Sequence, residues 1–411
     1  MEDKTFQMPV PAGILHMCER LHENGYDSYL VGGCVRDALL GIEPHDYDIC
    51  TQAVPDKIIE LFDDGLCKFY GKAFGTVCVH YADSEAEITT YRTESDYTDA
   101  RHPGRVDFAQ DVREDLARRD FTTNAIAYDP FTGLCDPYGG SDDLKNGVLR
   151  AVGDPAARFG EDALRIMRGM RFYARFGLVP EPETDRAMRE AAPNLARISV
   201  ERVFTELCGM LRGKHAADVL AAYADILSVW IPEIREIVEK GLWDKTARAV
   251  GAAEVSLQSR FSLLLYHLTP EQAAAILRRL RSDTRLCETV CCMLRHKDDC
   301  PSTMPALRAL RRQIGDTQLQ RLLHLRETIA ATDPDADAAA VARFKALYVE
   351  CVEKALCCTL AELAVGGRDA LALGLRDTTI GIALNAALTE VIEDRIPNEK
   401  AALTAFLERY V

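Results

Sequence analysis

A change of pattern near residue 150 constrains the fold of this 411-residue chain more than any other feature. From about residue 155 onward the pattern is helical almost throughout, with no fixed-period repeat. Before that point, helical stretches alternate with runs that predict strands, at residues 27–31, 46–50, 75–81 and 86–91. The sequence therefore predicts a small α/β head followed by a long all-helical body.

The composition is that of a globular chain with reduced thiols. Hydrophobic residues make up 48% of the sequence, yet no apolar run reaches the ~18 residues of a membrane-spanning helix. The N-terminus lacks the basic and apolar regions of a signal peptide. Fourteen cysteines occur at irregular spacing without a Cys-x-x-Cys pair. We expect a cytoplasmic protein that does not bind membranes.

The charge is segregated along the chain. The formal net charge is −15, which argues against a protein that coats DNA or RNA through many phosphate contacts. Residues 150–214 nevertheless carry twelve Lys/Arg against nine Asp/Glu. A local positive surface therefore follows directly after the α/β segment.

Acidic side chains in two predicted strands are the first candidates for chemistry. Asp46 and Asp48 follow a Gly32-Gly33 turn, and residues i and i+2 of a strand project from the same face. Glu87, in a later strand, would complete a carboxylate triad. A few oxygen ligands that leave room for phosphate and water suit Mg²⁺. The alternative is plain surface charge on an edge strand.

Two segments carry groups suited to a nucleotide. Glycines at 32 and 33 let the backbone approach an anion, and Arg36 follows them. The segment 118–124 places Arg119 beside a second arginine, and paired guanidinium groups suit a triphosphate. Asp120 and Asn124 in the same segment suit ribose hydroxyls.

The segment 161–175 is rich in arginine. The i, i+3 spacing of Asp162 and Arg165 predicts neighbours on one helix face, for which a simple intrahelical ion pair is the alternative. Arg168 and Arg171 follow at helical spacing and suit RNA phosphate.

Taken together, these strings resemble the class II nucleotidyltransferases of the polymerase-β superfamily, which include tRNA CCA-adding enzymes and bacterial poly(A) polymerases. The matching motifs cover about residues 28–210 and occur in one order: Gly32-Gly-x-Val-Arg-Asp37, Asp46-x-Asp48, Arg118-Arg-Asp-Phe-Thr122, Asp136-Pro-Tyr-Gly-Gly140, Glu161-Asp-x-x-Arg165 and Ser199-Val-Glu-Arg202.

The resemblance implies an α/β nucleotidyltransferase head with a five-stranded mixed or antiparallel sheet, followed by an all-α neck, body and tail. The expected boundaries are 1–150 for the head, 151–216 for a neck that selects the base and binds RNA, 217–304 for the body and 305–411 for a tRNA-binding tail.

The resemblance also implies residue roles. Asp46 and Asp48 would hold Mg²⁺, with Glu87 as a third catalytic carboxylate. Gly32, Gly33 and Arg36 would lie by the triphosphate. The residues expected around the ribose, the phosphates and the base are Arg119, Asp120, Asn124, Asp162, Arg165, Arg168 and Arg171.

Hydrogen-bond chemistry supports Asp162 and Arg165 as a protein template. Cytosine and adenine both present an amino donor beside a ring acceptor, which a carboxylate and a guanidinium match. Uracil and guanine present the reverse pattern and would leave buried polar groups unpaired. One pair therefore accounts for acceptance of CTP and ATP, although not for the change from C to A.

The expected activity is addition of CCA to the 3′ end of tRNA from CTP and ATP. The loop at 93–106 looks like the flexible loop that full CCA enzymes use for the terminal A. The alternatives are a poly(A) polymerase, an enzyme that adds only CC or only A, a nucleotidyltransferase acting on a small molecule or protein, and a noncatalytic RNA-binding protein with an inactive head. The sequence leaves open a monomer or a homodimer.

Overall fold

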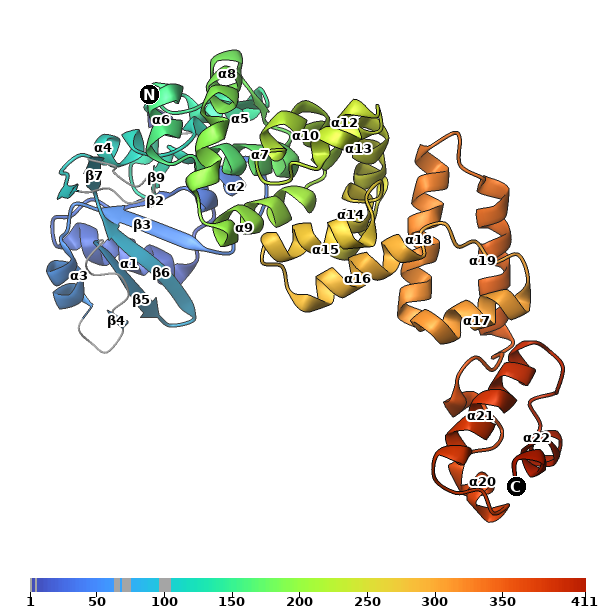
Figure 1. Ribbon diagram of the computed structural model, residues 1–411. Coiled ribbons are helices and arrows are strands. Elements are labelled where there is room, and N and C mark those ends of the chain that lie inside the picture. Colours follow the sequence, from blue (N-terminus) through green and yellow to red (C-terminus); the bar gives the residue numbers. More distant parts are fainter. Residues whose placement is uncertain (1, 4–5, 63–66, 69–74, 96–104) are drawn as a thin grey trace. The chain divides into compact units, whose positions relative to one another are not determined.

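The computed structural model describes residues 2–3, 6–62, 67–68, 75–95 and 105–411 (Figure 1). The chain forms two compact units, Met1–Val238 and Glu239–Val411. Unit 1 is drawn from blue through green in Figure 1, and unit 2 from yellow to red. No helix among the described residues is long and apolar enough to span a membrane.

Unit 1 contains a mixed sheet in the order β1-β10-β9-β2-β3-β6-β5-β4. Every neighbouring pair in it is antiparallel except β3 and β6, which are parallel. Its strands are β1 (Glu2–Asp3), β2 (Tyr29–Val31), β3 (Tyr47–Thr51), β4 (Cys67–Lys68), β5 (Thr76–Tyr81), β6 (Ser84–Thr90), β9 (Ala127–Asp129) and β10 (Gly133–Cys135). The predicted strands and the α/β head are thus confirmed.

Alternation of side chains decides which face of the sheet is covered. Val77 and Val79 on β5 and Ile88 on β6 are at most 1% exposed. Helices α1 (Ala12–Glu23) and α3 (Pro55–Leu61) pack against these two strands. Glu85 and Glu87, at the alternate positions of β6, are exposed. The sheet therefore has one apolar face and, around β5 and β6, one polar face.

The structure departs from the sequence expectation at the edges of the head. The sheet has eight strands rather than five, because two-residue strands β1 and β4 and the β9–β10 hairpin extend it. The ends of the expected loop at 93–106 pair as strands, β7 (Arg92–Ser95) with β8 (Arg105–Phe108). Tyr97, Asp99, Arg101, His102 and Pro103, the loop residues expected to serve terminal A addition, lie outside the described residues.

Helices fill the rest of unit 1, as predicted. A short parallel pair, β11 (Val148–Leu149) with β12 (Val179–Pro180), interrupts them. The remaining α-helices that begin in unit 1 are α2 (Gly33–Leu39), α4 (Val112–Ala117), α5 (Gly140–Lys145), α6 (Pro155–Glu161), α7 (Leu164–Phe176), α8 (Pro182–Ala191), α9 (Val200–Leu211), α10 (Ala216–Ala222), α11 (Ala224–Leu227) and α12 (Ile234–Glu239).

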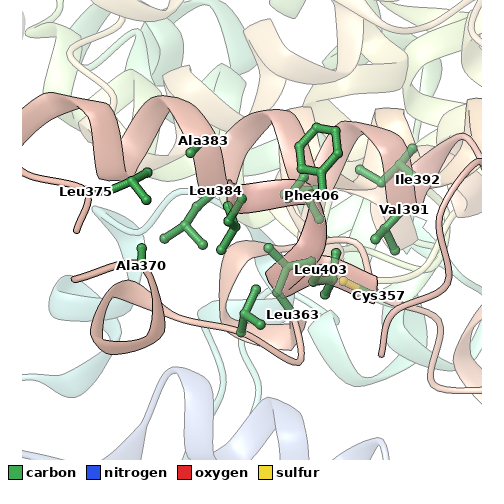
Figure 2. Packing of buried hydrophobic residues seen from close by; sticks show 14 residues of the cluster. Cys357, Leu363, Ala370, Leu375, Ala383, Leu384, Val391, Ile392, Leu403 and Phe406 are labelled. Atoms are coloured by element: carbon green, nitrogen blue, oxygen red, sulfur yellow. The ribbon is translucent and has the colours of Figure 1, made fainter. Parts of the chain in front are cut away.

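Unit 2 is helical throughout its described length. Its helices are α13 (Trp243–Ala252), α14 (Leu257–Leu264), α15 (Pro270–Arg279), α16 (Thr284–Arg295), α17 (Met304–Ile314), α18 (Asp316–Thr332), α19 (Ala338–Glu353), α20 (Gly367–Ala372), α21 (Asp377–Ile392) and α22 (Lys400–Leu407). Apolar side chains of α20, α21 and α22 close one core, with Leu403 and Ala387 fully buried (Figure 2). None of the thirteen cysteines whose side chains the structure describes is in a disulfide.

Candidate active site

The end of β2 turns sharply into α2 at Gly32. Its backbone has φ 74° and ψ −124°, a conformation that only glycine adopts without strain. A β-carbon at this position would lie 3.1 Å from the Nη1 atom of Arg119. Two features therefore favour glycine at position 32: the dihedral angles of the turn and the close approach of the Arg119 side chain. Gly33 has no such requirement, because its β-carbon would meet only ordinary contacts.

The register of β3 and β6 places two of the expected catalytic acids side by side. Asp48 pairs with Glu87 across the parallel ladder, so their side chains leave the same face on adjacent strands. Asp46 was expected within the strand, but β3 begins at Tyr47 and Asp46 directly precedes it. Register between β3 and β6, rather than alternation along one strand, therefore sets Asp48 beside Glu87.

The surroundings of Asp48 raise the pKa of its carboxyl group. Withdrawal from water is the largest cause, and the charges of Glu87 and Asp46 add to it, whereas Arg119 opposes it. The residue remains open to solvent, so its carboxylate is accessible. Crowded carboxylates of this kind offer hard oxygen ligands and unbalanced negative charge, which a divalent cation would relieve. The residues present therefore fit a divalent metal.

Next to these acids lies a pocket of about 500 Å³. Its lining holds seven arginines and three aspartates, a formal excess of four positive charges in a chain of net charge −15. Eleven predicted residues line it: Gly32, Gly33, Arg36, Asp48, Arg119, Asp120, Asn124, Asp162, Arg165, Arg168 and Arg171. Asp46 and Glu87 are not among its lining residues. An anionic ligand suits such a pocket.

Sequence reasoning named Arg118 only as the second arginine of the pair, and it missed three other pocket residues, Leu164, Phe172 and Arg202. Arg118 and Arg202 stand inside motifs that were noticed, in the arginine pair and in Ser199-Val-Glu-Arg202. Phe172 has no signal beyond an apolar position on α7. Its ring lies 4.8–5.5 Å from the guanidinium carbons of three arginines, at positions 36, 168 and 171. It thereby holds the basic wall of the pocket by cation–π contacts.

Buried Asp115 anchors the arginine pair. Its carboxylate, on a side chain 1% exposed, accepts from Arg118 at 2.7 Å and from Arg119 at 3.2 Å. Burial alone would raise the pKa of Asp115, but the two guanidinium groups outweigh it and hold the pKa below its ordinary value. Asp115 is thus a positioning residue that the sequence did not reveal.

Asp120 and Asn124 link the two sides of the pocket. Asp120 accepts from Asn124 Nδ2 at 2.9 Å and from Arg168 Nε at 2.7 Å. Asn124 Oδ1 in turn accepts from Arg36 Nη1 at 2.7 Å. Burial raises the pKa of Asp120, but Arg168 and Asn124 prevail and lower it to about 2. A bound ribose would have to share these oxygens with the protein.

Asp162 and Arg165 do not form the pair expected on one helix face. Helix α6 ends at Glu161, and Asp162 is extended, with φ −143° and ψ 103°. Its Oδ1 accepts the backbone N–H of Leu164 at 2.9 Å, a local bond that competes with helix continuation. Its Oδ2 accepts from Arg202 at 2.7 Å. The prediction of an i, i+3 pair was wrong because a helix break lies between the two residues.

Arg165 is held from three sides instead. Its Nη1 donates to Glu161 at 2.7 Å and to the Arg158 carbonyl at 3.1 Å, and its Nη2 donates to the Arg118 carbonyl at 3.0 Å. With respect to the described residues, three of its five N–H groups are used. Arg171 is fixed similarly by Glu206 at 2.5 Å. These arginines are held in place while they still border the pocket.

Comparison with known proteins places the chain in a family. The model described as "Poly A polymerase head domain" matches residues 28–150, "Probable RNA and SrmB-binding site of polymerase A" matches 177–237, and the model of tRNA nucleotidyltransferase domain 2 matches 256–407. The CCA-adding enzyme of Lactobacillus helveticus is 34% identical over 392 residues, 95% of each chain. That of Geobacillus stearothermophilus is 32% identical over 405 residues, 96% of this chain and 95% of its own.

A solved structure agrees over the same length. The Bacillus stearothermophilus CCA-adding enzyme in complex with CTP superposes with a TM-score of 0.72 at 29% identity, over 97% of this chain and 96% of that chain. Nucleotidyltransferases of this kind use divalent metal ions, which the carboxylates around Asp48 suit. The chain belongs to the CCA-adding enzyme family of nucleotidyltransferases.

Proposed function

We propose that this protein adds CCA to the 3′ end of tRNA, with CTP and ATP as nucleotide donors. The observation that carries the proposal is the basic pocket beside Asp48, which is large enough for a nucleotide and lined by the arginines described above. A relative of 29% identity has been solved with CTP, which fits the same assignment.

The reaction joins the 3′ hydroxyl oxygen of the tRNA to the α-phosphorus of the nucleotide. The bond from that phosphorus to pyrophosphate breaks, and the hydroxyl loses its proton. Mg²⁺, held by Asp46 and Asp48 with Glu87 beside them, would supply hydroxyl activation and neutralisation of the triphosphate. Arg119 and Arg36 would bind the phosphates, and Asp120 and Asn124 would keep these arginines and Arg168 in position.

Asp162 and Arg165 would select the base. Asp162 keeps acceptor capacity beyond its bonds to Leu164 and Arg202, since each carboxylate oxygen has more than one lone pair. The guanidinium of Arg165 keeps two N–H groups beyond its bonds to described residues. Together they offer an acceptor and a donor, the pattern that cytosine and adenine match.

The domain boundaries follow as part of the proposal. The head at 1–150 would carry the chemistry, the neck at 151–216 would select the base, and residues 217–304 and 305–411 would serve as body and tRNA-binding tail. The basic excess of residues 150–214 supports contact with RNA phosphates in the neck.

An incorporation assay tests the assignment. With a tRNA ending at the discriminator base, Mg²⁺, CTP and ATP, we expect two C and one A to be added and growth to stop. Unbounded A addition to any RNA would identify a poly(A) polymerase, and addition of CC or A alone would identify a partial enzyme.

The Asp48→Asn variant tests the metal seat in the same assay. We expect incorporation to fall by at least about a thousandfold, because a carboxylate that holds Mg²⁺ contributes several kcal/mol to the transition state. Binding of tRNA, measured by filter retention, should stay within about twofold. Asp154→Asn, an exposed substitution outside the pocket, is the matched control. Retained incorporation in Asp48→Asn would refute the proposal that Asp48 holds the metal ion.

A further inference from the structure

A second cluster of metal-binding side chains lies on the polar face of the sheet. Cys78 and His80 alternate along β5, and Glu85 lies opposite His80 on β6. Because i and i+2 share a face, and so do directly paired residues, all three side chains project together. Among the described residues this is the group of histidine, cysteine and acidic side chains whose ligand atoms all lie within 4.8 Å of one another.

The distances within this cluster resemble those of a tetrahedral metal site. Zn²⁺ bonds of about 2.3 Å to sulfur and about 2.0 Å to nitrogen or oxygen put neighbouring ligand atoms roughly 3.3–3.5 Å apart. Here Cys78 Sγ lies 3.9 Å from His80 Nε2 and 3.1 Å from Glu85 Oε1. His80 Nε2 lies 3.0 Å from Glu85 Oε2. The two contacts of Glu85 use different carboxylate oxygens, so a small turn of the carboxylate and an approach of the sulfur and nitrogen atoms by a few tenths of an ångström would bring three ligand atoms onto one ion.

The three side chains of the cluster differ in exposure to solvent. Cys78 is 5% exposed, so its thiol is held within the sheet face. The side chains of His80 and Glu85 are 30% and 59% exposed, which leaves an entry path and a position for water. Among the described residues the cluster offers three protein ligands, and three ligands with one open position are typical of an accessible Zn²⁺ site rather than a closed structural one.

We propose that Cys78, His80 and Glu85 bind a thiophilic divalent cation of the Zn²⁺ class. The ligand set differs in chemistry from the carboxylates around Asp48. A thiolate and an imidazole favour Zn²⁺ over Mg²⁺, whereas an all-carboxylate seat favours Mg²⁺. The two seats therefore take different ions.

The location ties this site to the catalytic acids. Cys78 pairs with Glu87 on β6, and Glu87 pairs with Asp48 on β3, so the three form one row across adjacent strands. An ion held by Cys78, His80 and Glu85 would lie next to Glu87 on the same face of the sheet. Binding would brace the β5–β6 hairpin and add positive charge beside the carboxylates.

Metal titration of the full chain, stripped with a chelator, tests the proposal. Wild type should bind one more equivalent of Zn²⁺ than His80→Gln and Cys78→Ser, or bind it at least about tenfold more tightly. The matched controls are His16→Gln, on α1, and Cys135→Ser, on β10, which should equal wild type. Equal stoichiometry and affinity in His80→Gln would overturn the site.

Co²⁺ gives a readout that a mere hydrogen-bonded cluster would not. In wild type and in both controls, Co²⁺ should produce the thiolate charge-transfer absorption, and Cys78→Ser should lose it. Saturating Zn²⁺ should also raise the melting temperature of wild type but not of His80→Gln. Persistence of the absorption in Cys78→Ser would refute the thiolate ligand. Excess Mg²⁺ should leave the absorption unchanged, and displacement would contradict the stated selectivity.

Discussion

At the scale of single residues, two aspartates of one pocket are driven in opposite directions. Partial withdrawal from water and the charges of Glu87 and Asp46 raise the pKa of Asp48, whereas Arg168 and Asn124 overcome burial and lower the pKa of Asp120 to about 2. Asp48 therefore holds surplus negative charge, which suits a metal. Asp120 is internally neutralised, which suits the positioning of other groups.

The lowered pKa of Asp120 makes its contribution to stability depend on pH. Since the folded pKa of about 2 lies below the ordinary 3.8, the ionised carboxylate stabilises the fold at neutral pH, and this is lost as pH falls from about 4 to about 2. We expect Asp120→Asn to lower the free energy of unfolding by about 2 kcal/mol at pH 7. Denaturant unfolding at several pH values measures this difference.

The difference between Asp120→Asn and wild type should shrink below pH 4. Asp154→Asn, exposed at the start of α6, provides the control and should match wild type at every pH. A difference that stays constant down to pH 2 would contradict the ion-pair explanation.

Asp162 is the second residue whose surroundings yield a prediction. If its carboxylate reads the amino group of the base, Asp162→Ala should lower the preference for CTP over UTP by at least about tenfold, since a mismatched polar group costs on the order of 1–3 kcal/mol. Single-nucleotide incorporation with each triphosphate measures this. Arg202→Ala removes the arginine that donates to Asp162, and with it one guanidinium of the pocket wall, but leaves the Asp162 carboxylate in place. Unchanged selectivity in Asp162→Ala would return this residue to a purely structural role.

At the scale of elements, the β2–α2 turn decides how closely Arg119 approaches the backbone. Gly32→Ala should cost about 1–3 kcal/mol of stability, because alanine is strained at φ 74° and ψ −124° and its β-carbon would crowd Arg119. Incorporation should fall as well, because Arg119 would move. Chemical denaturation and the incorporation assay measure the two effects.

Gly33→Ala is the matched control for that turn. Its φ is not in the left-handed region, and its added β-carbon would meet Arg36 Nη2 at an ordinary 3.6 Å. We expect stability within about 0.5 kcal/mol of wild type. An equal loss in both variants would argue against the dihedral explanation.

At the scale of the whole molecule, the chain divides into two compact units, which we expect to unfold separately. In unit 2, Arg308 is 3% exposed and donates to the carbonyls of Cys357 and Ile392 and to Asp394. Removing it would leave buried carbonyl groups without a donor. Arg308→Met should therefore destabilise unit 2 by about 3 kcal/mol and leave the pocket of unit 1 intact.

Calorimetry checks this separation of units. We expect Arg308→Met to lower one transition and CTP to raise the other. Arg312→Met should cost less than about 1 kcal/mol, because Arg312 lies on the same helix and bonds, within the described part of the chain, only to the side chains of Asn385 and Thr389. A single transition that both Arg308→Met and CTP shift would contradict independent cores.

The order and type of the elements, and most of the residues that line the pocket, could be predicted from the sequence alone. Runs in which apolar and polar residues alternate predicted strands of the sheet. The predicted pocket residues were found because each stands in a short contiguous motif, such as Arg118–Asn124. Only the tertiary structure decided which groups meet. Asp48 lies beside Glu87 because β3 and β6 pair in parallel register. Asp162 binds Arg202 rather than Arg165. Asp115 and Phe172 hold arginines of the pocket in position through an ion pair and a cation–π contact. Local periodicity specifies the face of an element, whereas partners from distant segments are fixed by packing and by where a helix breaks.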